Sequence, residues 1–206
     1  MFYEPKTDKV YTTLDEFRLA HPNTSFGDLT DVAHRNSVGL YELSVETQPH
    51  NRHYQELVLD RVDPTPQGGY LAVYVVKKRD MAPEQEAVAL ETVRAEQKRA
   101  IDDAWVAANL GSFMFRDKVI TCDTLDRQNI EGTTSYLNSH GTFPPGWPGG
   151  WKTDDNSYVE ITTPQDWKDF IAAMVTQGMT NFAKAQALKQ TLAEATTFES
   201  VLAVKW

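Results

Sequence analysis

The chain has 206 residues, 41% of them hydrophobic, with one cysteine and a formal net charge of −9. This acidic balance argues against a basic surface for nucleic acid or anionic lipid, and a single cysteine excludes an internal disulfide or a multi-cysteine zinc site. No apolar run approaches the length of a membrane span. The N-terminus lacks the layout of a secretory signal, so we expect folding in a cytoplasm.

The first predicted module covers residues 1–80. A short extended piece, Lys9–Tyr11, precedes Thr13, which has capping-box spacing to Glu16 and so predicts a helix start. Alternating apolar and polar residues then predict strands, and the last two of these, joined by a Pro/Gly loop, form an antiparallel pair. The three predicted strands are 38–45, 54–62 and 70–76.

A connecting helix is predicted over residues 81–110. Pro83 suits a helix start, and nothing interrupts the helix before Gly111. Six residues with 3–4 spacing form a candidate self-association seam, although a surface helix lying against one module is the competing interpretation. The seam consists of Leu90, Val93, Gln97, Ala100, Ala104 and Ala107.

The second predicted module covers residues 111–206 and opens on a β-hairpin. Phe113, Phe115 and Val119 flank a predicted polar turn, Arg116-Asp117-Lys118. After the hairpin, Asp123 has N-cap position with Asp126 three residues on. Cys122 ends the second strand, and we interpret it as a small buried hydrophobe rather than a nucleophile, since no histidine is near in sequence to activate it.

The stretch from 140 to 151, HGTFPPGWPGGW, predicts a stiff, aromatic-bearing loop because its prolines and glycines exclude helix and central strand. These aromatic rings could stack on a glycan, but we favour the simpler interpretation, a packed loop that closes the domain. A second hairpin is predicted around Asp154–Ser157.

A long helix is predicted after Thr163, which is followed by Pro164 and by an acid at the third helical position. Gly178 falls on the apolar face of this helix, where we expect a close approach by another element. Thr196 and Glu199 have capping-box spacing and predict a last short helix. The fold class is therefore α+β: a small N-terminal α+β module, a connecting helix and a C-terminal module of two hairpins packed with helices.

Catalysis is not expected from these patterns. The adjacent carboxylates Asp154/Asp155 and Asp102/Asp103 fall in a turn and on a helix face, whereas glycan hydrolysis needs two carboxylates at a set separation across a cleft. We expect no catalytic residues, no cofactor and no metal site.

The second module resembles an uncharacterised C-terminal domain of tailed-bacteriophage tail-fibre and tail-associated proteins. The resemblance covers roughly residues 90–206, and its most specific pieces are the hairpin FMFRDKVITCD and the ending ALKQTLAEATTFESV. It implies a structural role in the virion: a tail fibre, or an adaptor that joins a fibre to the tail or baseplate. The alternative is a tail-fibre assembly chaperone absent from the mature particle.

The resemblance also implies that the partners are other phage tail proteins. The N-terminal module would serve tail attachment or oligomerisation. The expected state is a homo-oligomer, a trimer if the chain is a fibre, with no nucleic-acid or membrane partner.

Overall fold

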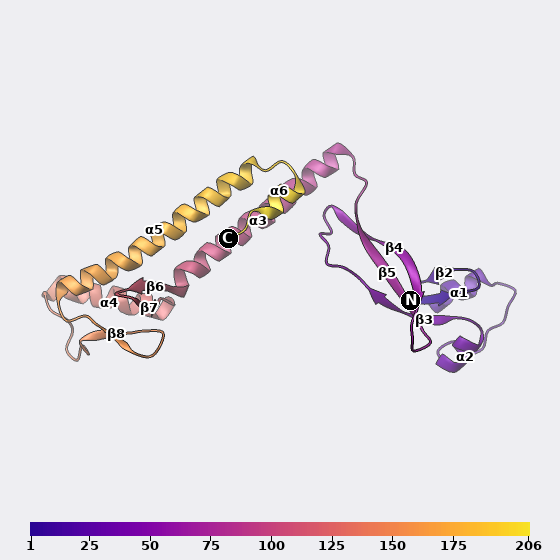
Figure 1. Ribbon diagram of the computed structural model, residues 1–206, viewed down its shortest axis with the longest axis horizontal. Coiled ribbons are helices and arrows are strands. Elements are labelled where there is room, and N and C mark those ends of the chain that lie inside the picture. The colour runs from indigo at the N-terminus through magenta and orange to yellow at the C-terminus, as the bar shows by residue number, and fades with distance from the viewer. The chain divides into compact units, whose positions relative to one another are not determined.

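The structure, a computed structural model, describes all residues 1–206 and divides the chain into two compact units, Met1–Glu86 and Ala87–Trp206 (Figure 1). With 47% of residues in helices and 22% in strands, the α+β fold class is confirmed. The helix predicted as a separate connection over 81–110 belongs, from Ala87 onward, to the second unit.

None of the helices combines the length and the apolar character that are needed to cross a lipid bilayer.

The first unit is built on a five-stranded sheet in the order β2-β1-β3-β5-β4. Neighbouring strands are antiparallel except for β3 and β5, which run parallel with Leu43 opposite Tyr70. The predicted antiparallel pair is present as β4 and β5. The strands are β1 (Phe2–Glu4), β2 (Lys9–Tyr11), β3 (Tyr41–Glu46), β4 (Gln55–Pro64) and β5 (Tyr70–Lys78).

Two short helices accompany this sheet. α1 (Leu14–Ala20) begins where predicted, because the Thr13 side chain accepts the backbone N–H of Glu16. α2 (Val32–Ser37), capped by Asp31, was not predicted. Val38 forms the C-cap of this helix and Gly39 turns the chain at φ +80°, so the strand predicted from residue 38 starts only at Tyr41.

A buried carboxylate ties β1 to the neighbouring elements of this unit. Glu4 accepts hydrogen bonds from the hydroxyls of Tyr11 (2.9 Å) and Thr7 (2.5 Å), and His21 at the end of α1 lies 3.2 Å away. Burial raises the pKa of Glu4, but these contacts outweigh it and lower the pKa overall. The adjoining apolar core contains Tyr11, Phe17, Leu29 and Leu40.

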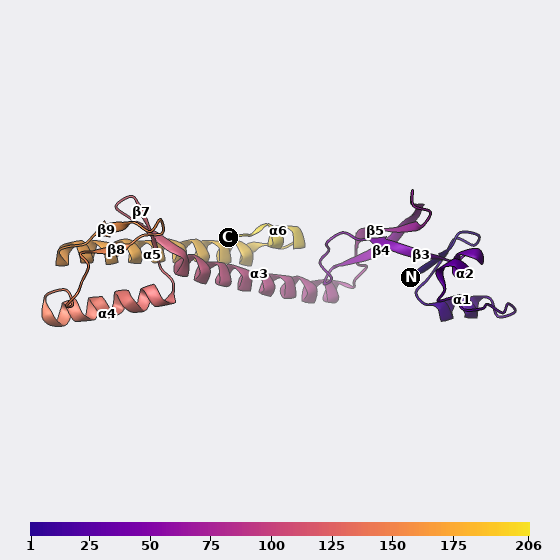
Figure 2. The ribbon, with the colours of Figure 1, turned by 90° about the horizontal axis from the view of Figure 1, so that it is seen from below.

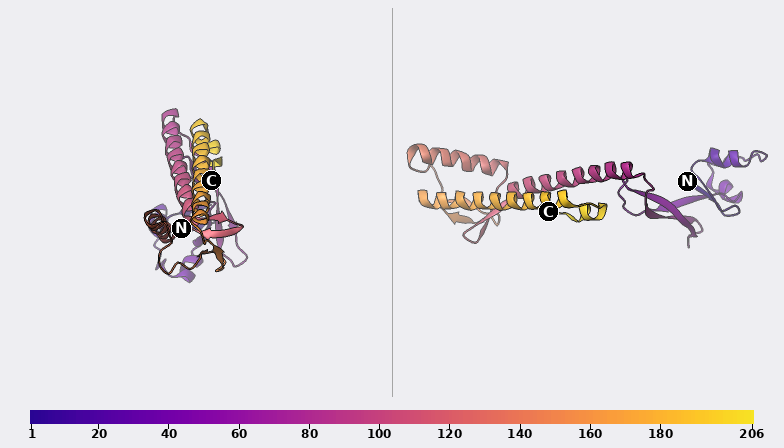
Figure 3. Two further views of the ribbon diagram at one scale, coloured as in Figure 1. Left: turned by 90° about the vertical axis from the view of Figure 1, so that its left-hand side faces the viewer. Right: turned by 90° about the horizontal axis from the view of Figure 1, so that it is seen from above.

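The second unit combines helices with two hairpins. α3 and α5 run side by side in antiparallel directions, and the short α6 folds back beside α3 (Figures 1 and 3). α4 lies near the hairpins at the opposite end of α5 from α6 (Figure 2). The elements are α3 (Pro83–Gly111), β6 (Ser112–Phe115), β7 (Lys118–Thr121), α4 (Thr124–His140), β8 (Gly150–Lys152), β9 (Tyr158–Glu160), α5 (Pro164–Glu194) and α6 (Phe198–Ala203).

Both predicted hairpins are present in this unit. β6 and β7 are joined by Arg116 and Asp117, both at positive φ, which is the backbone of a two-residue turn that matches the twist of the strands. In the second hairpin Gly150 is required by space, since a Cβ there would lie 2.4 Å from the Val159 carbonyl oxygen.

The core of this unit brings the hairpins against α4 and α5. Trp167 and Phe170 on α5 are fully buried, and the rings of Phe113 and Phe115 meet Phe170 edge to face at 5.1 and 5.3 Å. The predicted aromatic loop packs here as well, with Trp147 edge-on to Trp167 at 5.5 Å. The loop therefore closes the domain.

Two expectations about the last helices are wrong in detail. The N-cap of α6 is Thr197, whose side chain accepts the N–H of Ser200, so the pairing of Thr196 with Glu199 is not the capping box. Gly178 makes no close approach, since a Cβ at this position would meet nothing within 4 Å. The predicted caps Asp123 and Thr163, by contrast, are confirmed as capping boxes.

Candidate functional site

The candidate self-association seam on α3 is partly used inside the chain. Val93 is buried, and Leu90, Gln97 and Ala104 are half-buried. The Gln97 side-chain amide donates to the carbonyl oxygen of Val204, beyond α6. Only two of the six predicted residues, Ala100 and Ala107, remain exposed on the flank of the helix.

Polar contacts join α3 to α5 along their length. Asp102 pairs with Lys189, and near the middle of α5 the Asn181 amide donates to the Asn109 side chain at 2.9 Å. The Arg94 guanidinium donates to the Ala195 carbonyl at 2.6 Å. Since residue numbers rise on one helix as they fall on the other, these contacts are those of an antiparallel helical hairpin.

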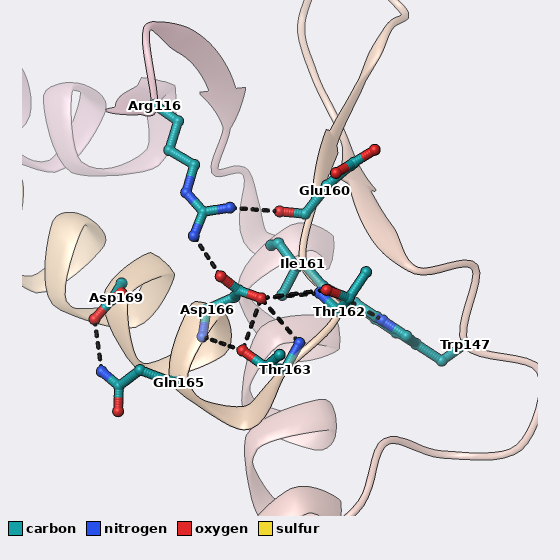
Figure 4. Close-up of polar contacts among 9 residues, drawn as sticks. All are labelled: Arg116, Trp147, Glu160, Ile161, Thr162, Thr163, Gln165, Asp166 and Asp169. Atoms are coloured by element: carbon teal, nitrogen blue, oxygen red, sulfur yellow. Dashed lines mark hydrogen bonds and ion pairs between the residues drawn. The ribbon is translucent and has the colours of Figure 1, made fainter.

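A second cluster joins the β6–β7 turn to the start of α5 (Figure 4). Arg116 donates one guanidinium nitrogen to the Glu160 carbonyl at 3.0 Å and another to the Asp166 carboxylate. The same guanidinium lies 4.9 Å from the centre of the Phe115 ring. One side chain therefore connects the first hairpin, the end of β9 and the first turn of α5.

Asp166 accepts the hydrogen bond from Arg116 and also takes part in the capping box of its own helix. Its other oxygen accepts the backbone N–H groups of Thr162 (3.2 Å) and Thr163 (2.9 Å) and the Thr163 hydroxyl (2.8 Å), as Figure 4 shows. The hydrogen bond from Arg116, followed by those from Thr163, holds the pKa of the Asp166 carboxyl well below its usual range. This carboxylate is thus held ionised near neutral pH.

Asp155 has the same role in the β8–β9 turn. It accepts the Ser157 hydroxyl (2.6 Å), the Thr153 hydroxyl (2.5 Å) and the Ser157 backbone N–H (3.0 Å), and these contacts hold its pKa well below the usual range. Lys118 on β7 reaches the same carboxylate at 3.1 Å. The Asp154 N–H donates to the Val119 carbonyl at 2.9 Å, so the two hairpins are joined by side chain and by backbone.

These arrangements hold parts together rather than prepare a proton transfer. A general acid or base needs a pKa near the working pH, whereas the carboxyls of Asp155 and Asp166 have pKa values shifted away from neutrality. The Arg116–Asp166 contact was missed in the sequence because fifty residues separate its partners. The positive φ of Arg116 follows from the turn and carries no signal in the residue type.

Cys122 lies inside the hairpin core and is 1% exposed. Burial raises the pKa of its thiol, and this outweighs the opposing effect of Arg127. A thiol nucleophile reacts as the thiolate, so the position disfavours reactivity. The expected role of Cys122 as a small buried hydrophobe is consistent with this placement.

Comparison with known proteins relates the second unit to one protein family. Residues 92–204 match the family model described as Domain of unknown function (DUF4376), which covers more than half of the chain and nearly all of the segment on which the phage resemblance rests. Nothing in the comparisons links this domain to phage tail proteins. No curated protein and no solved structure matches the chain.

Proposed function

This chain belongs to the DUF4376 family, whose description assigns no activity, and we propose that it is a structural component of a bacteriophage tail. It would be a tail fibre or an adaptor that joins a fibre to the tail or baseplate. Its place would be the virion, after synthesis in the cytoplasm of the bacterial host. Part of the support is the resemblance of the FMFRDKVITCD hairpin and the ALKQTLAEATTFESV ending to phage tail-associated proteins.

The observation that carries the proposal is the division of the chain into two units, Met1–Glu86 and Ala87–Trp206, each with a core of its own. An adaptor has to bind two different neighbours, and two separately folded units offer two independent surfaces for this. The first unit would attach to the tail, while the second, the family domain, would bind the neighbouring component.

The use of polar side chains in the second unit also supports a structural role. Arg116, Lys118, Asp155 and Asp166 are committed to joining the two hairpins with α5. Such contacts hold the two hairpins and α5 together, as a structural component requires, and they engage both carboxylates within the chain. We therefore propose that the chain is not an enzyme.

We place self-association of the chain on the exposed flank of α3. Val93 and Gln97 are occupied within the chain, so Ala100 and Ala107 are the seam residues available to a second copy. Small side chains permit close approach of two helices, and the fibre version of the proposal makes this state a trimer.

Mass spectrometry of gradient-purified phage particles tests the proposal. The chain is expected in the particle at a constant ratio to known tail proteins, and a cryo-EM map of the tail would locate it. Its presence in the host lysate but absence from particles would reject the structural role and support the assembly chaperone instead.

Light scattering of the full chain tests the oligomer separately. The double variant Ala100→Glu/Ala107→Glu should dissociate it, because charge would be forced into the contact between the copies. Ala187→Glu, at an exposed position on α5, is the matched control and should not change the mass. A monomer before any substitution would contradict the self-association proposal.

A further inference from the structure

In the second unit, a groove lies between α4 and the β8–β9 hairpin. Figure 2 shows these elements facing one another, and the groove has a volume of about 680 Å³, within the range of small-molecule sites. Its walls combine aromatic rings with hydroxyls, amides and carboxylates.

The aromatic wall of the groove is held in place before any ligand arrives. The Trp147 indole N–H donates to the Ile161 carbonyl at 2.9 Å, which fixes the ring plane (Figure 4). Trp151 lies 6.3 Å from Trp147, and both rings pack against buried Trp167, yet both keep part of their surface open. Tyr158 on β9 is 60% exposed. These rings are already ordered in the folded chain, so a ligand would bind them with little further loss of side-chain entropy.

Polar side chains of two elements border these rings. Asn129 and Thr133 come from α4, and Asp154 and Asn156 come from the β8–β9 turn. None of these four side chains makes a hydrogen bond within the chain, in contrast to Asp155 in the same turn. Two amides, a hydroxyl and a carboxylate supply both donors and acceptors for a ligand.

The combination of flat aromatic faces with mixed donors and acceptors suits a sugar. The C–H groups of a pyranose ring carry partial positive charge and pack on the negative face of an aromatic ring, while amides and carboxylates bind its hydroxyls. The charge of the groove selects among sugars. Its lining contains three carboxylates, Asp123, Asp126 and Asp154, but only one cationic side chain, Lys152, so the groove repels anions. We propose that this groove binds a neutral oligosaccharide.

Titration of the purified full chain with neutral trisaccharides tests this proposal, with calorimetry and tryptophan fluorescence as readouts. The probes are maltotriose, cellotriose and chitotriose, compared with 3′-sialyllactose as the anionic probe and choline as the cationic one. At least one neutral sugar should bind saturably at millimolar concentration or below. Because Trp147 and Trp151 line the groove, the fluorescence should change on binding.

Three variants connect this binding to the groove. Tyr158→Ala should weaken binding at least about threefold, whereas Tyr158→Phe, which keeps the ring, should retain most of it. Asn156→Gly removes an amide at a position with φ +61°, which glycine adopts freely, so the turn should survive and the affinity should fall. Met179→Ala, at an exposed position on α5 outside the groove, is the control and should bind as the unchanged chain does.

The proposal fails if no neutral sugar binds at millimolar concentration, or if Tyr158→Ala and Asn156→Gly both bind as the unchanged chain does. A preference for sialyllactose or for choline would also overturn it, since either would mean that charge rather than neutral hydroxyls is recognised. These results do not depend on where the chain resides in a virion, so the tail proposal can fail while sugar binding holds, and the reverse.

Discussion

Replacement of Gly178 by alanine should stabilise the second unit. Gly178 lies inside α5, where glycine is disfavoured relative to alanine by about 0.8–1.0 kcal/mol because it loses more backbone freedom on folding. A Cβ at this position meets nothing within 4 Å, and the φ of the residue is not in the left-handed region, so no clash or strain offsets the gain. We expect the free energy of unfolding to rise by about 0.8 kcal/mol.

Thermal unfolding followed by far-UV circular dichroism measures this change, because α3, α4 and α5 dominate the helical signal. The expected increase in Tm is about 3 °C. Gly132→Ala inside α4, which also has open space for a Cβ, should shift Tm in the same direction. Gly150→Ala should lower stability by about 3 kcal/mol, since its Cβ would lie 2.4 Å from the backbone oxygen of Val159.

The result that would refute this reasoning is a lower Tm for Gly178→Ala with a normal increase for Gly132→Ala. That pair of outcomes would mean that another element contacts α5 at Gly178, as the sequence pattern had suggested and the structure contradicts.

Three further predictions concern the N-cap of α5, the carboxylates Asp155 and Asp166, and the Cys122 thiol. Thr163→Ala removes the N-cap of α5 and should cost about 1 kcal/mol of stability in urea unfolding, and an unchanged midpoint would show that Asp166 caps the helix alone. Asp155 and Asp166 have lowered pKa values in the folded chain, so their stabilising effect is complete above the ordinary carboxyl pKa near 4 and is lost as pH falls below it. Tm should therefore decline from pH 5 to pH 2, and the decline should be less steep in Asp166→Asn. The Cys122 thiol should resist iodoacetamide in the folded chain and react fully in urea, as mass spectrometry would show, whereas rapid alkylation without denaturant would contradict its burial.

Local signals in the sequence were enough to predict much of the second unit. A cap forms between residues three apart, so the roles of Asp123 and Thr163 can be read from spacing alone. The turn at Arg116 and Asp117 is likewise defined by the polar residues between two apolar strands. The same local reasoning fails at α6, where Thr196 and Thr197 are adjacent candidates and both offer a hydroxyl.

Packing is what the sequence pattern could not show. The spacing on α3 indicated an apolar seam, but only the fold decides that Val93 is buried within the chain and that Gln97 binds the carbonyl oxygen of Val204. An apolar helix face has to be buried against another surface, but the spacing of its apolar residues does not indicate which surface that is. Gly178 illustrates the same limit, since its place on a face does not reveal whether anything approaches it.

Long-range pairing belongs wholly to the tertiary structure. Arg116 and Asp166 are fifty residues apart, and the parallel pairing of β3 with β5 passes over an intervening strand in the sequence. The groove between α4 and the β8–β9 hairpin likewise collects residues from 121 to 158. The sequence by itself determined most of the elements and the caps at Thr13, Asp123 and Thr163, because those depend on neighbours along the chain. The fold decided the contacts, because those depend on which surfaces bury each other.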